Sequence, residues 1–342
     1  MNNRQIAGLA GGLGAFFAAL AMSRRAAPDF AGKSVVIAGG SRGLGLVIAR
    51  ELAAEGARIT LMARDAEELD RARRDLEERG ADSVHTVVCD IRERGQVERA
   101  IAEIGTLRGG IDVLINNAGV IQVGPIEHMG LQDFENAMAT HFYGPLYTIL
   151  AALPYLKQSR TARLVNISSI GGKIAVPHLL PYSSSKFALV GLSEGLRPEL
   201  AKYGISVTTI CPGLMRTGST YNAMFKGQHR AEFAWFHLAD AMPGLTVHAR
   251  RAARQIVEAC RRGDAELIVG LPAKLAVLMN AACPQTTATL MTLANRLLPR
   301  PDARAGTEQR PGWQSVSRLA PSILSRLSDR ATRENNETPA GA

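Results

Sequence analysis

Seven short apolar runs that alternate with helical patterns constrain the fold of this 342-residue chain more than any other feature. Amphipathic, charged segments such as AEELDRARRDLEERG separate the runs. This alternation predicts parallel strands joined by crossover helices. The runs are SVVIAGG, ARITLMAR, SVHTVVCD, IDVLINNAG, ARLVNISS, GISVTTICPG and AELIVG. We therefore expect an α/β fold over residues 28–270, a Rossmann-type doubly wound parallel sheet of about seven strands with helices on both faces.

The N-terminal segment, residues 1–27, differs from this pattern. Residues 6–22, IAGLAGGLGAFFAALAM, carry no charge, and Arg4 and Arg24 flank them. An apolar run of this length is a little short of the ~20 residues that span a bilayer. We interpret it as a candidate membrane anchor, and a cleaved signal peptide or a surface-packed arm are the alternatives.

Two further segments follow the seven runs. Residues 271–300 are mostly apolar and helical, which fits either a cap over a substrate pocket or a surface that lies on a membrane. Residues 301–342 are rich in Arg, Ser, Pro and Gly, so we expect a mostly disordered basic tail. One or two amphipathic turns are expected near residues 313–327.

The formal net charge of +9 favours anionic partners such as cofactor phosphates, anionic lipid or nucleic acid. The sequence has no RNA-binding aromatic signature, no long Lys/Arg run and no Cys/His zinc spacing. We therefore predict that the protein binds neither nucleic acid nor a metal. The cysteines form no motif and are expected to be reduced core residues of a catalytic domain in the cytoplasm. They are Cys89, Cys211, Cys260 and Cys283.

A glycine-rich loop, GGSRGLG, follows the first apolar run. Gly39, Gly43 and Gly45 give the spacing G-x-x-x-G-x-G between a strand and a helix. A phosphate needs backbone N–H groups and close approach of the chain there, and the helix N-terminus adds a favourable dipole. The loop is therefore interpreted as the phosphate site of a dinucleotide. Its other candidate cofactor-binding residues are Ser41, Arg42 and Leu44.

The end of the second run predicts which dinucleotide is bound. A carboxylate commonly stands there and binds the ribose 2′-OH of NAD, but here the position is Ala63, followed by Arg64. The guanidinium groups of Arg64 and Arg42 favour a 2′-phosphate through charge-assisted hydrogen bonds. We therefore predict NADP(H) rather than NAD(H), and an arginine that only solvates a strand end is the alternative for Arg64.

The third and fourth runs are expected to end at the same crevice, because ligands of doubly wound sheets lie beyond the carboxyl ends of the strands. Asp90 is placed to meet the adenine edge, and Ile91 can pack on the adenine ring. The fourth run ends in NNAG, which contributes the candidates Asn117, Ala118 and Gly119.

The fifth run carries chemically active side chains to this crevice. It ends at Ser168 and Ser169, and the helical pattern that follows holds Tyr182 and Lys186 four residues apart, on one helix face. A tyrosine ionises near pH ~10, and a nearby ammonium stabilises its phenolate. A serine hydroxyl can bind a carbonyl oxygen, so these residues predict a centre for proton transfer.

With these motifs the chain resembles the short-chain dehydrogenase/reductase family over residues 33–270. The motifs are GGSRGLG, NNAG, a serine 13 residues before the tyrosine, Y-S-S-S-K and PGLMRT. The resemblance implies that Tyr182 is the general acid/base and that Ser169 polarises the carbonyl. Lys186 would lower the pKa of Tyr182 and bind the nicotinamide ribose. It also implies cofactor binding by Pro212, Gly213 and Thr217, and a homo-oligomer formed through the helices that carry His141 and Tyr182.

His141 departs from the family pattern. The family usually has an Asn in a segment like V-N-x-x-G after the fourth strand, and THFYG places His141 there. That Asn helps to hold a water that passes protons to the lysine. An imidazole can also accept or donate a hydrogen bond, so His141 is a candidate catalytic relay residue, with a packing histidine as the alternative. Gly144 and Pro145 fit a bend in the same helix.

The resemblance implies an NADP(H)-dependent oxidoreductase that transfers hydride between nicotinamide and a carbonyl or alcohol group. Residues 218–244 form either a lid helix packed on the core or an apolar wall for a lipid-like, steroid-like or retinoid-like substrate. Their large apolar side chains are Met224, Phe225, Phe233, Trp235 and Phe236. A nucleotide-binding regulator that has lost turnover is the competing hypothesis. A third option, a peripheral protein whose basic tail binds anionic lipid, is compatible with either.

Overall fold

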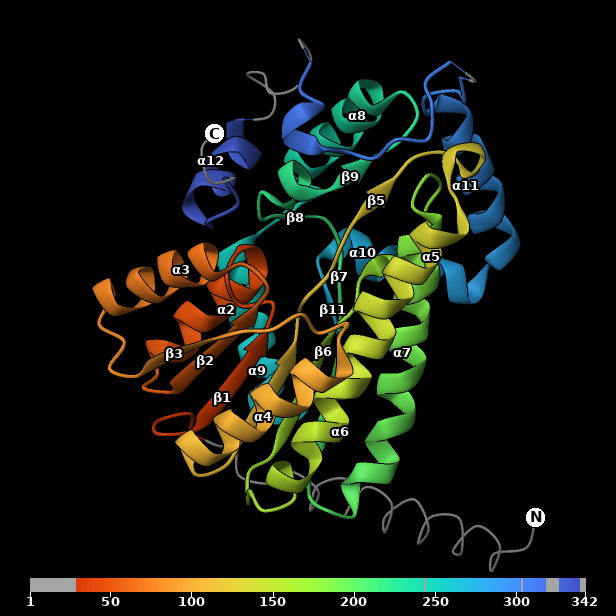
Figure 1. The fold of residues 1–342 in the computed structure, drawn as a ribbon. Helices are drawn as coiled ribbons and strands as arrows, with labels where there is room; N and C mark the ends of the chain where they lie inside the picture. The colour runs from red at the N-terminus through yellow and green to blue at the C-terminus, as the bar shows by residue number, and fades with distance from the viewer. Residues whose placement is uncertain (1–28, 243, 303, 318–325, 339–342) are drawn as a thin grey trace, which may run out of the picture.

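The computed structural model describes residues 29–242, 244–302, 304–317 and 326–338. Its centre is a parallel sheet with the strand order β11-β7-β6-β4-β1-β2-β3 (Figure 1). The seven predicted runs form these seven strands, so the predicted fold class is confirmed. The strands are β1 (Ser34–Ala38), β2 (Arg58–Ala63), β3 (Val84–Val88), β4 (Val113–Asn116), β6 (Arg163–Ile167), β7 (Ser206–Pro212) and β11 (Glu266–Val269).

Helices cover both faces of the sheet (Figure 1). Val35 and Ile37 of β1 pack with α2, α3 and α9, whereas Val36 and Ala38 pack on the opposite face with α4, α6 and α7. Burial on both faces explains why the strands read as continuous apolar runs. The helices are α2 (Gly43–Ala53), α3 (Ala66–Glu78), α4 (Arg94–Arg108), α6 (Gly144–Leu156), α7 (Leu180–Ala201) and α9 (Ala249–Arg262).

The strand order reverses at β1, which pairs with β2 on one side and with β4 on the other. A crevice forms where the connections leave in opposite directions, outside the carboxyl ends of these strands. The glycine loop, the NNAG turn and the turn η3 (Ile170–Gly172) all begin at this edge. The topology alone therefore gathers the predicted motifs.

A smaller lobe lies beyond the same edge. Its interior holds Phe225 and Phe233, both fully buried, together with Val123 and Leu179. The lobe contains β5 (Gln122–Val123), β9 (Met224–Phe225) and β12 (Arg310–Pro311) in one small sheet, and β8 (Met215–Arg216) and β10 (Val247–His248) in another. Its helical elements are α8 (His229–Ala241), η1 (Ile126–His128), η4 (Ser219–Asn222) and η5 (Gly312–Gln314).

A π-helical turn, η2 (Ala139–Tyr143), joins α5 (Leu131–Met138) to α6. The Gly144 N–H donates to the Ala139 carbonyl, five residues earlier. Pro145 has no N–H for the carbonyl four residues before it, that of His141, which favours a departure from the α pattern. A Cβ at Gly144 would lie 2.6 Å from Ile91 Cδ1, so a residue with a side chain would force a shift here.

The C-terminal part of the chain corrects one prediction. Residues 304–317 and 326–338 are not disordered: they form β12, η5 and α12 (Arg326–Glu334), and Ser315 and Glu337 are buried. Their order comes from contacts with residues far away in the sequence. Before them, α10 (Leu271–Ala282) and α11 (Pro284–Leu297) form a helical hairpin.

Two other predictions concern cysteines and the membrane. Cys89, Cys211 and Cys260 are free and buried, as predicted, but Cys283 is exposed at the turn between α10 and α11. Within the part of the chain that the structure describes, no helix has the length and apolarity needed to cross a membrane. The predicted anchor at residues 6–22 lies outside the described residues.

Candidate active site

Loops at the carboxyl ends of the strands enclose a cavity of about 1070 Å³. Gly45 and His141 do not line this cavity, whereas the other predicted site residues do. Those residues are Gly39, Ser41, Arg42, Gly43, Leu44, Arg64, Asp90, Ile91, Asn117, Ala118, Gly119, Ser169, Tyr182, Lys186, Pro212, Gly213 and Thr217. Met224, Trp235 and Phe236 of the smaller lobe also line it.

The glycine loop is held tightly against the end of β4. Gly39 has a φ of +77°, and a Cβ there would lie 2.5 Å from Ala118 Cα. A Cβ at Gly45 would lie 2.0 Å from the Gly39 carbonyl oxygen, which also accepts a 2.8 Å hydrogen bond from Asn117 Nδ2. Gly45 and Asn117 thus shape the loop, and Gly43 and Leu44 face the cavity.

Glu68, which the sequence analysis missed, organises the side of the cavity next to β2. Its carboxylate accepts a 3.0 Å hydrogen bond from Ser41 Oγ and a 3.0 Å ion-paired bond from Arg42 Nη1. Asp65 caps α3 by accepting from the Glu68 N–H. The pattern D-x-x-E at the start of α3 could have located Glu68, because this capping spacing fixes a glutamate in the first helical turn.

Asp90 lies at the end of β3 and is paired with Arg92. The Arg92 guanidinium donates to the Asp90 carboxylate at 2.6 to 3.0 Å. Burial works to raise the pKa of Asp90, but the hydrogen bonds from Arg92 and the charges of Arg92 and Arg64 outweigh it, so the pKa is lowered. Asp90 therefore presents an ionised, pre-positioned carboxylate to the cavity.

Ser169, Tyr182 and Lys186 lie close together in the cavity wall. Lys186 Nζ lies 5.7 Å from the Tyr182 ring centroid and donates a 2.9 Å hydrogen bond to the Ile167 carbonyl. Burial lowers the pKa of Lys186 to about 7. Burial also raises the pKa of Tyr182, although its hydrogen bond with Ser169 partly counteracts this. The pKa of Tyr182 thus shifts opposite to the expected direction, because desolvation outweighs the hydrogen bond with Ser169.

His141 lies behind the wall and bridges two parts of the site. Its Nε2 accepts a 3.1 Å hydrogen bond from the Val120 N–H, so Nδ1 carries the proton and contacts Ser185 Oγ at 2.7 Å. Its ring meets the Tyr182 ring edge to face at a centroid distance of 5.4 Å. Complete burial and the charge of Lys186 hold the pKa of His141 well below its usual value. A neutral His141 therefore joins the NNAG turn to helix α7.

A chain of buried polar side chains fixes α7 against the sheet. Asn116 Nδ2 donates to Asn166 Oδ1 at 2.9 Å, and Asn166 Nδ2 donates to Ser193 Oγ at 3.0 Å. Thr209 Oγ1 also donates to Ser193 Oγ, at 2.8 Å. The chain links β4, β6 and β7 to the helix that carries Tyr182, and such satisfied buried networks specify one arrangement.

Comparison with known proteins gives the same result as the motifs. The family model described as short chain dehydrogenase matches residues 33–225. The mouse 3-ketodihydrosphingosine reductase is 36% identical over 185 residues, which are 53% of this chain and 56% of that protein. Gluconate 5-dehydrogenase of Gluconobacter oxydans is 31% identical over 192 residues, 56% of this chain and 75% of that protein. The chain thus spans little more than half of the mouse relative.

A solved structure shows how far the likeness of the folds extends. The crystal structure of a short-chain dehydrogenase from Streptomyces avermitilis superposes with a TM-score of 0.66 at 27% identity. The match covers 77% of this chain and 97% of that one. The matched family model accounts for more than half of the sequence, and its motifs converge on one cavity. This chain therefore belongs to the short-chain dehydrogenase family.

Proposed function

We propose that the protein is an NADP(H)-dependent oxidoreductase that interconverts a carbonyl and an alcohol group on a hydrophobic substrate. The observation that carries this proposal is the convergence of Ser169, Tyr182 and Lys186 on one cavity. The glycine loop lines the same cavity, as do the apolar side chains of Met224, Trp235 and Phe236.

The bound dinucleotide supplies or accepts the hydride. In the reducing direction the Tyr182 hydroxyl donates its proton to the carbonyl oxygen, and in the oxidising direction the phenolate accepts that proton. The Ser169 hydroxyl donates a hydrogen bond to the same oxygen and fixes its position. Lys186 would bind the nicotinamide ribose hydroxyls, and the guanidinium groups of Arg42 and Arg64, which line the cavity, would bind a 2′-phosphate.

The proposed substrate class follows from the large apolar side chains that line part of the cavity. Trp235, Phe236 and Met224 line it, whereas Phe225 and Phe233 form the buried core behind them. The mouse relative is named for 3-ketodihydrosphingosine, which supports a hydrophobic ketone as substrate. The direct experiment is to measure NADPH consumption by the purified protein with aliphatic, aromatic and steroid-like ketones. Cofactor binding without turnover across this panel would favour a regulator with the same fold.

Replacing His141 by alanine is expected to lower kcat about 10-fold or more, because the NNAG turn and α7 lose their connection. His141→Asn should retain most activity, since its amide can accept from the Val120 N–H and donate to Ser185 Oγ. Steady-state kinetics check both variants, and the Kd for NADPH should change little.

The pH profile separates positioning by His141 from proton relay. A buried, neutral histidine does not titrate in the working range, so His141→Asn should leave the pH dependence of kcat unchanged. A shifted profile would support the relay, and near-wild-type rates in both variants would support simple packing.

We also propose that the α10–α11 hairpin rests on an anionic lipid surface. Residues 271–300 contain no Asp or Glu, and their charged residues are Lys274, Arg296 and Arg300. Six leucines of this hairpin are exposed: Leu271, Leu275, Leu278, Leu290, Leu293 and Leu297. Apolar side chains beside basic ones favour binding to anionic membrane surfaces.

Sedimentation with phosphatidylserine vesicles tests this surface. In a chain without residues 1–25, the double change Leu275→Ser and Leu278→Ser is expected to reduce the vesicle-bound fraction several-fold. The change removes apolar surface that the membrane would bury. Leu107→Ser, at an exposed leucine of α4, is the matched control and should have no effect. Equal binding of both variants would contradict the proposal.

We propose that the protein forms a homo-oligomer through α6 and α7. Leu150 of α6 and Phe187 of α7 are exposed on the two helices that the resemblance assigns to subunit contact. The mass of the purified protein in solution would test it, as would the loss of association in a Phe187→Glu variant.

A further inference from the structure

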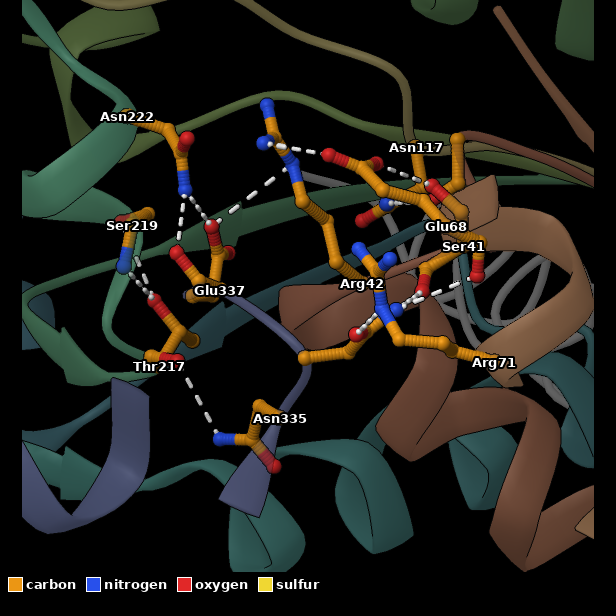
Figure 2. A network of polar contacts seen from close by, with 12 residues as sticks. Ser41, Arg42, Glu68, Arg71, Asn117, Thr217, Ser219, Asn222, Asn335 and Glu337 are labelled. Carbon is orange, nitrogen blue, oxygen red and sulfur yellow. Dashed lines mark hydrogen bonds and ion pairs between the residues drawn. The ribbon is translucent and has the colours of Figure 1, made fainter. Parts of the chain in front are cut away.

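We name the described residues 326–338 the C-terminal strap. The strap lies across the glycine loop at the entrance of the cavity (Figure 2). The strap begins with α12, which is attached to the smaller lobe. Ser328 Oγ donates to Asp240 Oδ2 at 3.1 Å, and His237 Nε2 lies 3.1 Å from Asp329 Oδ1. One end of the strap is thereby anchored to α8, the helix that also carries Trp235 and Phe236.

Beyond α12 the strap binds the backbone of both rims of the cavity. The Gly43 N–H, at the start of helix α2, donates to the Asn335 carbonyl at 2.8 Å. Asn335 Nδ2 donates to the Thr217 carbonyl at 3.2 Å on the opposite rim. Arg50 Nη2 donates a 2.9 Å hydrogen bond to the Glu334 carbonyl in the same stretch. The strap therefore occupies a backbone donor that the glycine loop would offer to a phosphate.

Asn336 fastens the strap to the side of the cavity next to β2. It has a φ of +57°, a conformation that asparagine adopts more easily than most residues. Its Nδ2 donates to the Ser41 carbonyl at 2.8 Å and to the Glu68 carbonyl at 3.1 Å, and its Oδ1 accepts from Arg71 at 2.8 Å. Both hydrogen-bonding ends of its amide are thus used.

Glu337 places a carboxylate inside the entrance (Figure 2). It is only 4% exposed, accepts a 2.6 Å hydrogen bond from Asn222 Nδ2 and lies 3.6 Å from Arg42 Nε. A Cβ built on Gly43 would fall against its Oε1, so the carboxylate touches the glycine loop itself. Burial raises the pKa of Glu337, and the charge of Arg42 counteracts this. A buried carboxylate is costly unless it is paired, and here Arg42 and Asn222 pair it.

We propose that the strap is a self-inhibitory segment in which Glu337 competes with the dinucleotide phosphates for the glycine loop and Arg42. The inference rests on the proposed dinucleotide binding at this loop. The helix N-terminus and the guanidinium attract one anion, and a second anion beside a buried carboxylate is repelled. The dinucleotide binds when residues 335–338 withdraw, so the affinity of the full chain includes the cost of opening the strap.

The test uses the full chain and two single substitutions. Glu337→Gln keeps the hydrogen bond from Asn222 but removes the charge, and Asn336→Ala removes the bonds to Ser41 and Arg71. Both are expected to bind NADPH about tenfold more tightly than the unaltered chain in titration calorimetry at fixed ionic strength. Glu334→Gln is the matched control, because among the described residues its side chain pairs with the exposed Arg330 alone. The affinity of this variant for NADPH should not change.

A second readout follows the strap directly. Hydrogen exchange at residues 335–338 of the unaltered chain should become faster when NADPH is added. NADPH affinities within twofold of the unaltered chain for both variants would overturn the inference and leave the proposed function intact. Weaker binding by Glu337→Gln would also overturn it, since the strap would then hold the cofactor in place. If no variant binds NADPH or NADH, the proposed function fails, and the inference fails with it.

Discussion

Tyr182→Phe is expected to lower kcat/KM for carbonyl reduction roughly 10²- to 10⁴-fold, the usual contribution of a positioned general acid. The phenyl ring keeps the edge-to-face contact with His141 and its place beside Lys186, so the change removes little besides the hydroxyl. The Kd for NADPH should stay within about threefold, because the lost group acts on the substrate oxygen. Stopped-flow measurement of NADPH oxidation with a reactive ketone checks the rate.

The matched control is Tyr203→Phe, which removes the hydroxyl of an exposed tyrosine just beyond the end of α7. It should leave the rate and the melting temperature unchanged. An active Tyr182→Phe variant would refute the proton-transfer assignment. A loss of rate together with a loss of folded structure would show that the hydroxyl serves stability.

The second large effect concerns the choice of dinucleotide. The unaltered chain is expected to prefer NADPH, and Ala63→Asp should lower the ratio of kcat/KM for NADPH to that for NADH about 100-fold. Ala63 ends β2 and lines the cavity next to Arg64. A carboxylate there would repel the 2′-phosphate of NADPH and accept a hydrogen bond from the 2′-OH of NADH.

Ala63→Asn is the control for size, since it adds a polar side chain of the same shape without the charge. Its effect on the ratio should be much smaller than that of aspartate. If the unaltered chain prefers NADH by tenfold or more, the assignment of NADP(H) is wrong. In that case the pairing of Arg42 with Glu68 would explain why its guanidinium does not serve a 2′-phosphate.

The sequence was sufficient to predict the fold and the composition of the cavity wall, because both depend on local patterns. Each parallel strand is a short apolar run, and the residue that follows it must lie at the same edge of the sheet. Ser169, Tyr182 and Asn117 could therefore be assigned to one crevice before any distance was known. The spacing of Tyr182 and Lys186 needed only the helical period.

Features that depend on long-range contacts could not be predicted. Glu337 contacts Arg42 near the start of the sheet and Asn222, which lies 115 residues before it, and no periodic pattern marks such contacts. Its surroundings in the sequence, rich in polar residues, are typical of disorder. The direction of the Tyr182 pKa shift could not be predicted either, because it depends mainly on how completely the side chain is buried.

The position of the strap after the sheet in the chain also has a consequence for biosynthesis. The residues that the strap contacts, from Ser41 to Asp240, belong to the glycine loop, the sheet domain and the smaller lobe. All of them are translated well before Arg326. Because domains fold from the N-terminal side during synthesis, the sheet can be complete at β11 while the strap is still on the ribosome. Newly made protein would then meet its first dinucleotide with an open glycine loop, before the strap closes.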